Sequence, residues 1–150
     1  MRATIAAAVA LVALALLTAC GGEKREIEIA YGTDVCEYCR MTIDDPALAA
    51  AFEDAEGHVH LFDEPGCMAS WLRERRDNAG KAMVRDADGR GWLEAQQAYF
   101  ARGQRTPMAF GFVAYADRDA ALVASRPAGA PLATWTSILT EELKANAPTR

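Results

Sequence analysis

In the middle of the chain, apolar and polar positions alternate as they do in strands and then repeat at helical spacing. Residues 47–54 and 58–62 lie on either side of residues 55–57, whose sequence Ala-Glu-Gly predicts a hairpin turn. A helix is predicted to start at Pro65, a favourable first position for proline, behind acidic residues that can cap it. A short strand at residues 82–86 completes the order strand, strand, helix, strand.

The second half of the chain repeats that order less clearly. Residues 108–116 form the strongest strand pattern in the sequence, and Asp117 can cap a helix that continues to about residue 126. A further strand is predicted at residues 132–135, followed by an amphipathic helix at residues 137–146.

Both halves contain a strand that leads through an acidic cap into a helix. The segments that share this feature are residues 60–64 and 113–117, although few of their residues are identical. We therefore expect an α+β fold made of two small, similar ββαβ units, residues 36–89 and residues 90–147.

An apolar run precedes the part that is expected to fold. Arg2 is followed by an uncharged stretch of Ala, Val and Leu that ends at Cys20. A transmembrane helix needs about 20 apolar residues, and no basic cluster follows this stretch, so a cleaved export signal is the better interpretation. Residues 17–20 (LTAC) have the pattern of a bacterial lipobox. This pattern predicts removal of residues 1–19 and attachment of lipid to Cys20.

The segment after the lipidation site is polar and the chain as a whole is acidic. Residues 20–35 are rich in Gly and Glu and are predicted to be a flexible tether, with a possible edge strand at residues 26–30. Gly21 follows the lipidated cysteine, which favours the periplasmic side of the outer membrane. The formal net charge of −5 argues against a nucleic-acid-binding protein, which needs a basic face.

Soft sulfur donors gather just beyond the tether. Cys36, Cys39 and Met41 lie within six residues, and Arg40 between them would favour a thiolate. Thiolate and thioether sulfur together select Cu(I) over harder divalent ions, so we expect a Cu(I)-binding protein. A structural disulfide, a thiol–disulfide oxidoreductase using Cys36 and Cys39, and a zinc site remain as alternatives.

Four further residues could contribute to such a site. Met108 follows a rigid proline and could supply a second thioether, but a core methionine is the simpler interpretation. His58 and His60 alternate on one strand face, a spacing that a metal ion can use. Cys67 is interpreted first as a buried packing residue and second as a spare ligand. No general acid, base or activated nucleophile stands out, so we expect that the protein is not an enzyme.

These motifs, taken in order, resemble the NosL family of copper-chaperone lipoproteins accessory to nitrous oxide reductase. The resemblance covers about residues 34–117 and, besides the lipobox, rests on residues 36–43 (CEYCRMTI), 62–68 (FDEPGCM), 92–95 (WLEA), 98–99 (AY), 106–108 (TPM) and 111–114 (GFVA).

The resemblance implies a function, partners and a fold. It implies delivery of Cu(I) for the copper–sulfur centre of nitrous oxide reductase, together with a periplasmic and ABC-transporter assembly complex. It also implies two ββαβ units that resemble the organomercurial lyase core.

The resemblance also implies particular ligands. Cys39 and Met41 match the soft ligands that the family keeps best, and Met108 becomes a ligand or a gate. Cys36 matches a position that some members lack, and Arg40 replaces a frequent glycine. The expected metal site is thus Cys36, Cys39, Met41, Met108 and His60.

Overall fold

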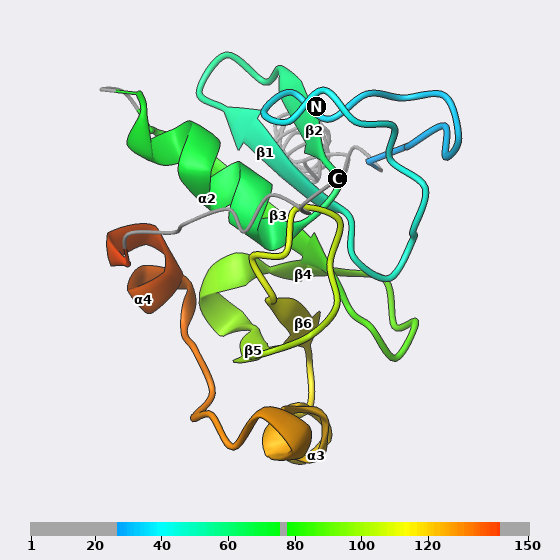
Figure 1. Cartoon of the computed structure of the whole chain (residues 1–150). Helices are drawn as coiled ribbons and strands as arrows, with labels where there is room; N and C mark the ends of the chain where they lie inside the picture. The colour runs from blue at the N-terminus through cyan, green and yellow to red at the C-terminus, as the bar shows by residue number, and fades with distance from the viewer. Residues whose placement is uncertain (1–26, 76–77, 142–150) are drawn as a thin grey trace, which may run out of the picture.

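The computed structural model describes residues 27–75 and 78–141 (Figure 1). A four-stranded antiparallel sheet has the strand order β2-β1-β3-β4. Its strands are β1 (Ala50–Asp54), β2 (Val59–Phe62), β3 (Gly80–Arg85) and β4 (Trp92–Glu94). The hairpin turn between β1 and β2 lies where the sequence predicts it. The mixture of helices and antiparallel sheets confirms the predicted α+β class.

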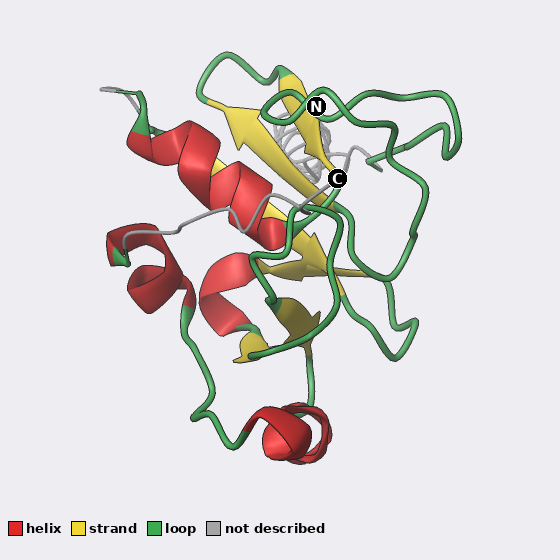
Figure 2. Cartoon of the chain, in the orientation of Figure 1, coloured by secondary structure: helices red, strands yellow, loops and turns green. Residues whose placement is uncertain are grey.

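A smaller sheet and four further helical segments follow in the second half of the described chain. β5 (Tyr99–Ala101) pairs with β6 (Val113–Tyr115). The remaining segments are two 3-10 helices, η2 (Ala95–Gln97) and η3 (Arg126–Ala128), and the α-helices α3 (Arg118–Ser125) and α4 (Trp135–Thr140). Helix α4 lies beside α2 (Pro65–Arg73), and α3 lies at the end of the molecule away from the β1–β2 hairpin (Figure 2).

The two sheets have related connections. β1 pairs with both β2 and β3, and α2 connects β2 to β3. β5 pairs with β6 and, after α3, also with Ala133 through an isolated bridge. The order β5, β6, α3 and the Ala133 bridge thus repeats the ββαβ order of the first half, with the last strand reduced to a single bridge. β4, which lies in the second of the expected units, pairs with β3 of the first.

The core lies between α2 and the larger sheet. Met68, Trp71 and Leu72, which repeat at helical spacing, are all buried. The Trp71 ring lies against Phe62 and Phe52, with ring centroids 5.3 and 6.0 Å away. Complete burial of a side chain of this size contributes about 1.5–3 kcal/mol. These contacts fix α2, and with α2 the residues at its first turn.

Helix α2 starts at Pro65 as predicted, but its cap differs from the prediction. Glu64 holds the N-cap position and its side chain makes no capping hydrogen bond. Its carboxylate instead accepts a hydrogen bond from the backbone N–H of Met108, 2.6 Å away. By contrast, Asp117 caps α3 as expected, because its carboxylate accepts from the N–H groups of Asp119 and Ala120.

The strand predicted at residues 108–116 is wrong over most of its length, because only Val113–Tyr115 forms β6. Residues 106–112 form an irregular loop instead. The N–H of Ala109 donates to the Thr106 carbonyl, and Ala109 has a positive φ of 57°. These features turn the chain out of the extended conformation. The strand expected at residues 132–135 is likewise reduced to the bridge at Ala133.

The described end of the predicted tether is bound to the folded body. The indole N–H of Trp92 donates to the Ile27 carbonyl, and Val35 forms a bridge with Thr42. Residues 27–30 are irregular rather than an edge strand. No helix within residues 27–75 and 78–141 is long and apolar enough to cross a membrane. The export signal, Cys20 and the predicted helix beyond residue 141 lie outside the described residues.

Candidate metal centre

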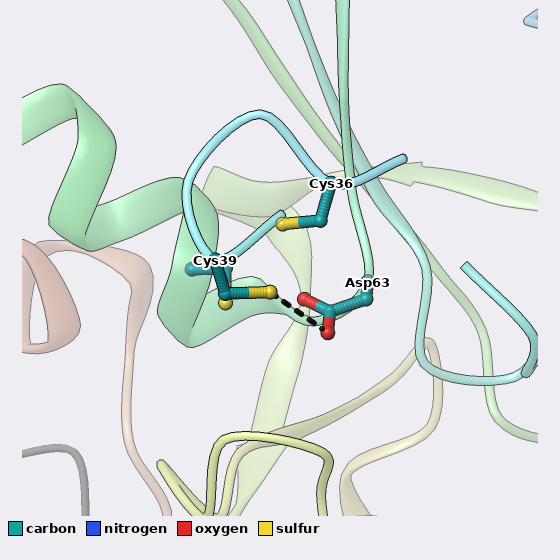
Figure 3. Close-up of side chains that lie close together, drawn as sticks. Cys36, Cys39 and Asp63 are labelled. Atoms are coloured by element: carbon teal, nitrogen blue, oxygen red, sulfur yellow. Dashed lines mark hydrogen bonds between the residues drawn. The ribbon is translucent and has the colours of Figure 1, made fainter. Parts of the chain in front are cut away.

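The segment with the sequence motif folds into a tight turn. The N–H of Cys36 donates to the Met41 carbonyl over 2.8 Å, and the N–H of Arg40 donates to the Cys36 carbonyl over 3.0 Å. Arg40 has a φ of 64°, in the left-handed region that favours glycine. The turn directs the side chains of Cys36 and Cys39 towards each other (Figure 3).

A second segment meets this turn at the junction of β2 and α2. The N–H of Glu37 donates to the carbonyl of Leu61 in β2 over 3.0 Å, which fixes the turn beside the end of that strand. Asp63 follows the strand, and Cys67 lies in the first turn of α2. Two parts of the chain that are about 30 residues apart therefore supply side chains to one place.

Four side chains form the cluster that we call the sulfur cluster: Cys36, Cys39, Cys67 and Asp63. Their three sulfur atoms and one carboxylate oxygen all lie within 4.8 Å of one another. The thiol of Cys39 donates to Oδ2 of Asp63 over 3.3 Å (Figure 3). Cys36 and Cys67 are fully buried, Asp63 is nearly so, and Cys39 is partly exposed.

The three thiols differ in acidity. A hydrogen bond from the Cys67 thiol lowers the pKa of Cys36 to about 7, because this bond and those from the N–H groups of Cys39 and Asp63 outweigh burial. Burial raises the pKa of Cys39 to about 12. The hydrogen bond to Cys36, followed by burial, raises the pKa of Cys67. Cys36 is therefore the most acidic of the three thiols, and its thiolate form is stabilised by the hydrogen bond from Cys67.

The cluster has the donors and the unsatisfied atoms expected of a site for a metal ion. Oδ1 of Asp63 is buried and has no hydrogen-bond partner within the described part of the chain. A buried carboxylate oxygen without a partner is costly, and a bound cation would offset that cost. Three thiolates and a carboxylate are ligands for soft and borderline ions such as Cu(I) and Zn(II). Binding would displace the protons that Cys39 and Cys67 hold.

The sequence predicted two members of the sulfur cluster as metal ligands and did not give the other two a primary role in binding. Cys36 and Cys39 come together as expected. Cys67, interpreted first as a packing residue, is buried but also contributes its sulfur. Asp63 is one of the acidic residues before Pro65 for which the sequence predicts only a role in capping the helix. The available signal was the position of Asp63 just before the N-cap of α2, because a residue there can pack against the first helical turn, which contains Cys67.

The two methionines of the predicted site lie at different depths. Met41 is 44% exposed, and its backbone N–H donates to the sulfur of Cys39. Met108 is half-buried against the core, and its backbone N–H is held by Glu64. Met41 therefore presents a thioether to solvent beside the sulfur cluster, whereas Met108 is tied to the residue that follows Asp63.

His60, the remaining predicted ligand, lies outside the sulfur cluster. Its Nδ1 is 3.0 Å from Oε1 of Glu37, and its Nε2 is 3.3 Å from Oδ2 of Asp54. The ring packs on Trp71 with a centroid distance of 4.6 Å. Both ring nitrogens therefore face carboxylates rather than sulfur.

The loop at residues 106–112 extends from the second half of the chain to the first turn of α2 (Figure 1). A Cβ atom on Gly66 would lie 2.3 Å from Cβ of Phe110, so the phenyl side chain lies directly on that glycine. The Phe110 ring is also 6.4 Å from the ring of Tyr38 in the cysteine turn. The loop therefore contacts both segments that supply the sulfur cluster.

Comparison with known proteins gives a match to a solved structure. No protein-family model and no curated protein sequence matches this chain. The fold matches the crystal structure of the copper chaperone NosL from Shewanella denitrificans with a TM-score of 0.68. The match has 17% sequence identity and covers 79% of this chain and 98% of that chain. It establishes a NosL-like fold and supports the resemblance drawn from the motifs.

Proposed function

We propose that this chain is a copper chaperone that holds Cu(I) in the sulfur cluster and releases it to an acceptor protein. The observation that carries the proposal is the convergence of three cysteine sulfurs from two separate segments within 4.8 Å. Thiolate sulfur is the ligand type that binds Cu(I) best among protein side chains. The NosL-like fold and the motif at residues 36–41 support the same function.

The accessibility of the donors suits a carrier. Cys36 and Cys67 are fully buried and would retain the ion, whereas Cys39 is partly exposed and Met41 is exposed. A thioether needs no deprotonation and binds weakly. An acceptor could therefore replace the ligands in turn, beginning at the side of Cys39 and Met41.

We further propose the acceptor and the location. The resemblance to NosL favours copper delivery to nitrous oxide reductase and its periplasmic and ABC-transporter assembly complex. The export signal and the lipobox favour a protein anchored by lipid on Cys20 to the periplasmic side of the outer membrane. Pull-down of the reductase from envelope extracts with the copper-loaded chain, but not with the metal-free chain, would test the first point.

Titration with Cu(I) against a competing chelator, under reducing conditions, tests the binding site. Cys36→Ser, Cys39→Ser and Cys67→Ser should each weaken binding by at least about 100-fold, more than is typical of a residue outside the ligand shell. Cys20→Ser is the matched control, because this cysteine is the predicted lipidation site and should not affect metal binding. Equal affinities for all four variants and the parent would refute the proposal.

A zinc-binding function is the second candidate, and the position of Asp63 favours it. Zn(II) accepts a carboxylate oxygen together with cysteine sulfur in a tetrahedral set, whereas Cu(I) prefers sulfur alone. Asp63→Asn should therefore weaken Zn(II) binding strongly and change Cu(I) binding by less than about tenfold. A chain that binds Zn(II) more tightly than Cu(I) at equal free concentrations would overturn the copper assignment.

The thiol–disulfide oxidoreductase alternative is disfavoured by burial. An attacking thiol must be both acidic and accessible. Here the thiol with the lowered pKa belongs to Cys36, whose side chain is fully buried. Cys39 is partly exposed, but burial raises its pKa. Neither cysteine combines the two requirements.

A further inference from the structure

The β1–β2 hairpin brings two imidazoles and a carboxylate to one face, outside the sulfur cluster. The antiparallel register pairs Phe52 with His60 and Glu53 with Val59. Asp54 thus lies opposite His58, and both share a strand face with His60. Oδ2 of Asp54 is 3.2 Å from Nδ1 of His58 and 3.3 Å from Nε2 of His60.

The turn fixes the carboxylate of Asp54 in this orientation. Its Oδ1 accepts hydrogen bonds from the backbone N–H groups of Glu56 and His58, at 3.1 and 2.8 Å. These bonds belong to the hairpin turn. They leave Oδ2 directed at the two imidazoles.

His60 has the environment of a metal-ligating histidine. Such histidines commonly donate their second ring N–H to a carboxylate, which fixes the tautomer and the ring orientation. Here Nδ1 lies 3.0 Å from Oε1 of Glu37, and the ring rests on Trp71. A neutral imidazole carries one N–H and can donate to only one of its two carboxylate neighbours. If Nδ1 donates to Glu37, the Nε2 lone pair faces Asp54, an arrangement that a cation between them would stabilise.

We propose that His58, His60 and Asp54 form a second metal site, which takes a divalent transition-metal ion and prefers Cu(II). Imidazole and carboxylate are ligands for divalent first-row ions, and Cu(II) binds most tightly among these. The side chain of His60 is 20% exposed, so solvent ions reach it, and that of His58 is 75% exposed and can turn towards the ion. The site does not depend on the proposed function of the sulfur cluster.

The test is electron paramagnetic resonance of Cu(II) bound to the full, tag-free chain whose thiols have first been capped with Ag(I). Silver occupies the sulfur atoms and prevents them from reducing Cu(II). We expect one bound Cu(II) per chain with hyperfine coupling to nitrogen. His60→Gln and Asp54→Asn should each lower the affinity for Cu(II) at least tenfold. Glu37→Gln should lower it by about 10-fold, as expected for a partner of a ligating histidine.

Glu56→Gln is the matched control, because this exposed carboxylate lies in the same turn but only its backbone contacts Asp54. It should leave Cu(II) binding unchanged. The proposal is overturned if His60→Gln and Asp54→Asn, with unchanged circular dichroism, bind Cu(II) as tightly as the parent. It is also overturned if the bound Cu(II) shows no coupling to nitrogen. Either result would leave His60 as an ion-pairing residue between two carboxylates.

Discussion

At the scale of single residues, Arg40 shows how the backbone of the cysteine turn constrains its sequence. Its φ of 64° is costly for any residue with a Cβ atom. The resemblance to NosL marked this position as a frequent glycine, and the structure supplies the reason. The left-handed conformation lets the chain reverse between Cys39 and Met41 and return to pair Thr42 with Val35.

Replacement of Arg40 by glycine should therefore stabilise the chain. The relieved strain is about 1–2 kcal/mol, and the greater freedom of glycine in the unfolded state offsets roughly half of it. We expect a net gain of up to about 1 kcal/mol in the free energy of unfolding, measured by urea denaturation. Arg40→Val is the contrasting variant and should destabilise, because a β-branched residue tolerates this φ poorly. Destabilisation by Arg40→Gly would contradict the argument.

Glu64 makes a pH-dependent contribution to stability. Burial raises its pKa from 4.5 to about 7, although hydrogen bonds from the Thr106 hydroxyl and the Met108 N–H lower it. Between pH 4.5 and about pH 7, the Glu64 carboxyl group is protonated in the folded chain but ionised in the unfolded chain. The contribution of Glu64 to stability therefore falls as pH rises through this window, and the penalty is complete above about pH 7.

Glu64→Gln should remove this dependence, because glutamine does not titrate and keeps the oxygen that accepts from Met108. In the metal-free, reduced chain, the parent should lose stability relative to the variant between pH 5 and pH 8. The expected change is on the order of 2–3 kcal/mol, since each pKa unit corresponds to about 1.4 kcal/mol. Urea unfolding of both proteins at the two pH values measures it. A difference that stays constant with pH would show that Glu64 does not titrate as described.

At the scale of elements, the sequence correctly predicted those features that depend on contacts between residues close together in the chain. The hairpin, the start of α2 at Pro65 and the cap of α3 by Asp117 were all found where expected. The loop at residues 106–112 was not, because its conformation depends on Glu64, which lies 44 residues earlier. A pattern of apolar residues alone cannot reveal that a distant carboxylate holds the backbone N–H of Met108.

The packing of this loop on α2 gives a prediction about Gly66. An alanine usually stabilises a helix relative to glycine by about 0.5–1 kcal/mol. Here the added Cβ would lie 2.3 Å from Phe110, so Gly66→Ala should instead destabilise the chain by about 1–3 kcal/mol. Thermal unfolding measures the change.

The double variant Gly66→Ala with Phe110→Gly separates packing from helix propensity. The nearest contact of the new methyl group is Cβ of Phe110, so removal of the whole side chain leaves room for it, and the effects of the two substitutions should not add. A coupling of about 1 kcal/mol or more is expected for residues in direct contact. Simple additivity would show that Gly66 and Phe110 do not constrain each other.

At the scale of the whole molecule, the candidate site depends on how the two segments meet. The sequence predicted Cys36 and Cys39 because they are neighbours in a motif. It could not place Cys67 and Asp63 with them, because their proximity depends on the hydrogen bond from Glu37 to Leu61 and on the packing of α2. His60 was grouped with the sulfur ligands, but its strand face directs it towards Asp54.

A metal ion in the sulfur cluster should therefore stabilise the entire fold, because it joins the cysteine turn to α2. Free Cu(I) at 100 times the dissociation constant should add about 2.7 kcal/mol to the free energy of unfolding. The midpoint of thermal unfolding should rise accordingly in the parent and should rise far less in Cys36→Ser, which is expected to bind the ion at least about 100-fold more weakly.

Asp117→Ala provides the control for that measurement. Loss of the α3 cap should lower stability by about 1 kcal/mol, yet the increase caused by Cu(I) should be the same as in the parent. A smaller increase in this variant would show that α3 influences the sulfur cluster. The absence of any increase in the parent would show that the four donors do not bind the ion.

The unequal exposure of the three cluster thiols has a consequence for survival in an oxidising environment. Cys36 and Cys67 are sealed inside the protein, and Cys39 alone among them has contact with solvent. An oxidant that arrives from outside must therefore react at Cys39 before it can damage the other two. Cys39, the thiol through which the metal ion would enter, is thus the cluster thiol most vulnerable to oxidation in the metal-free protein.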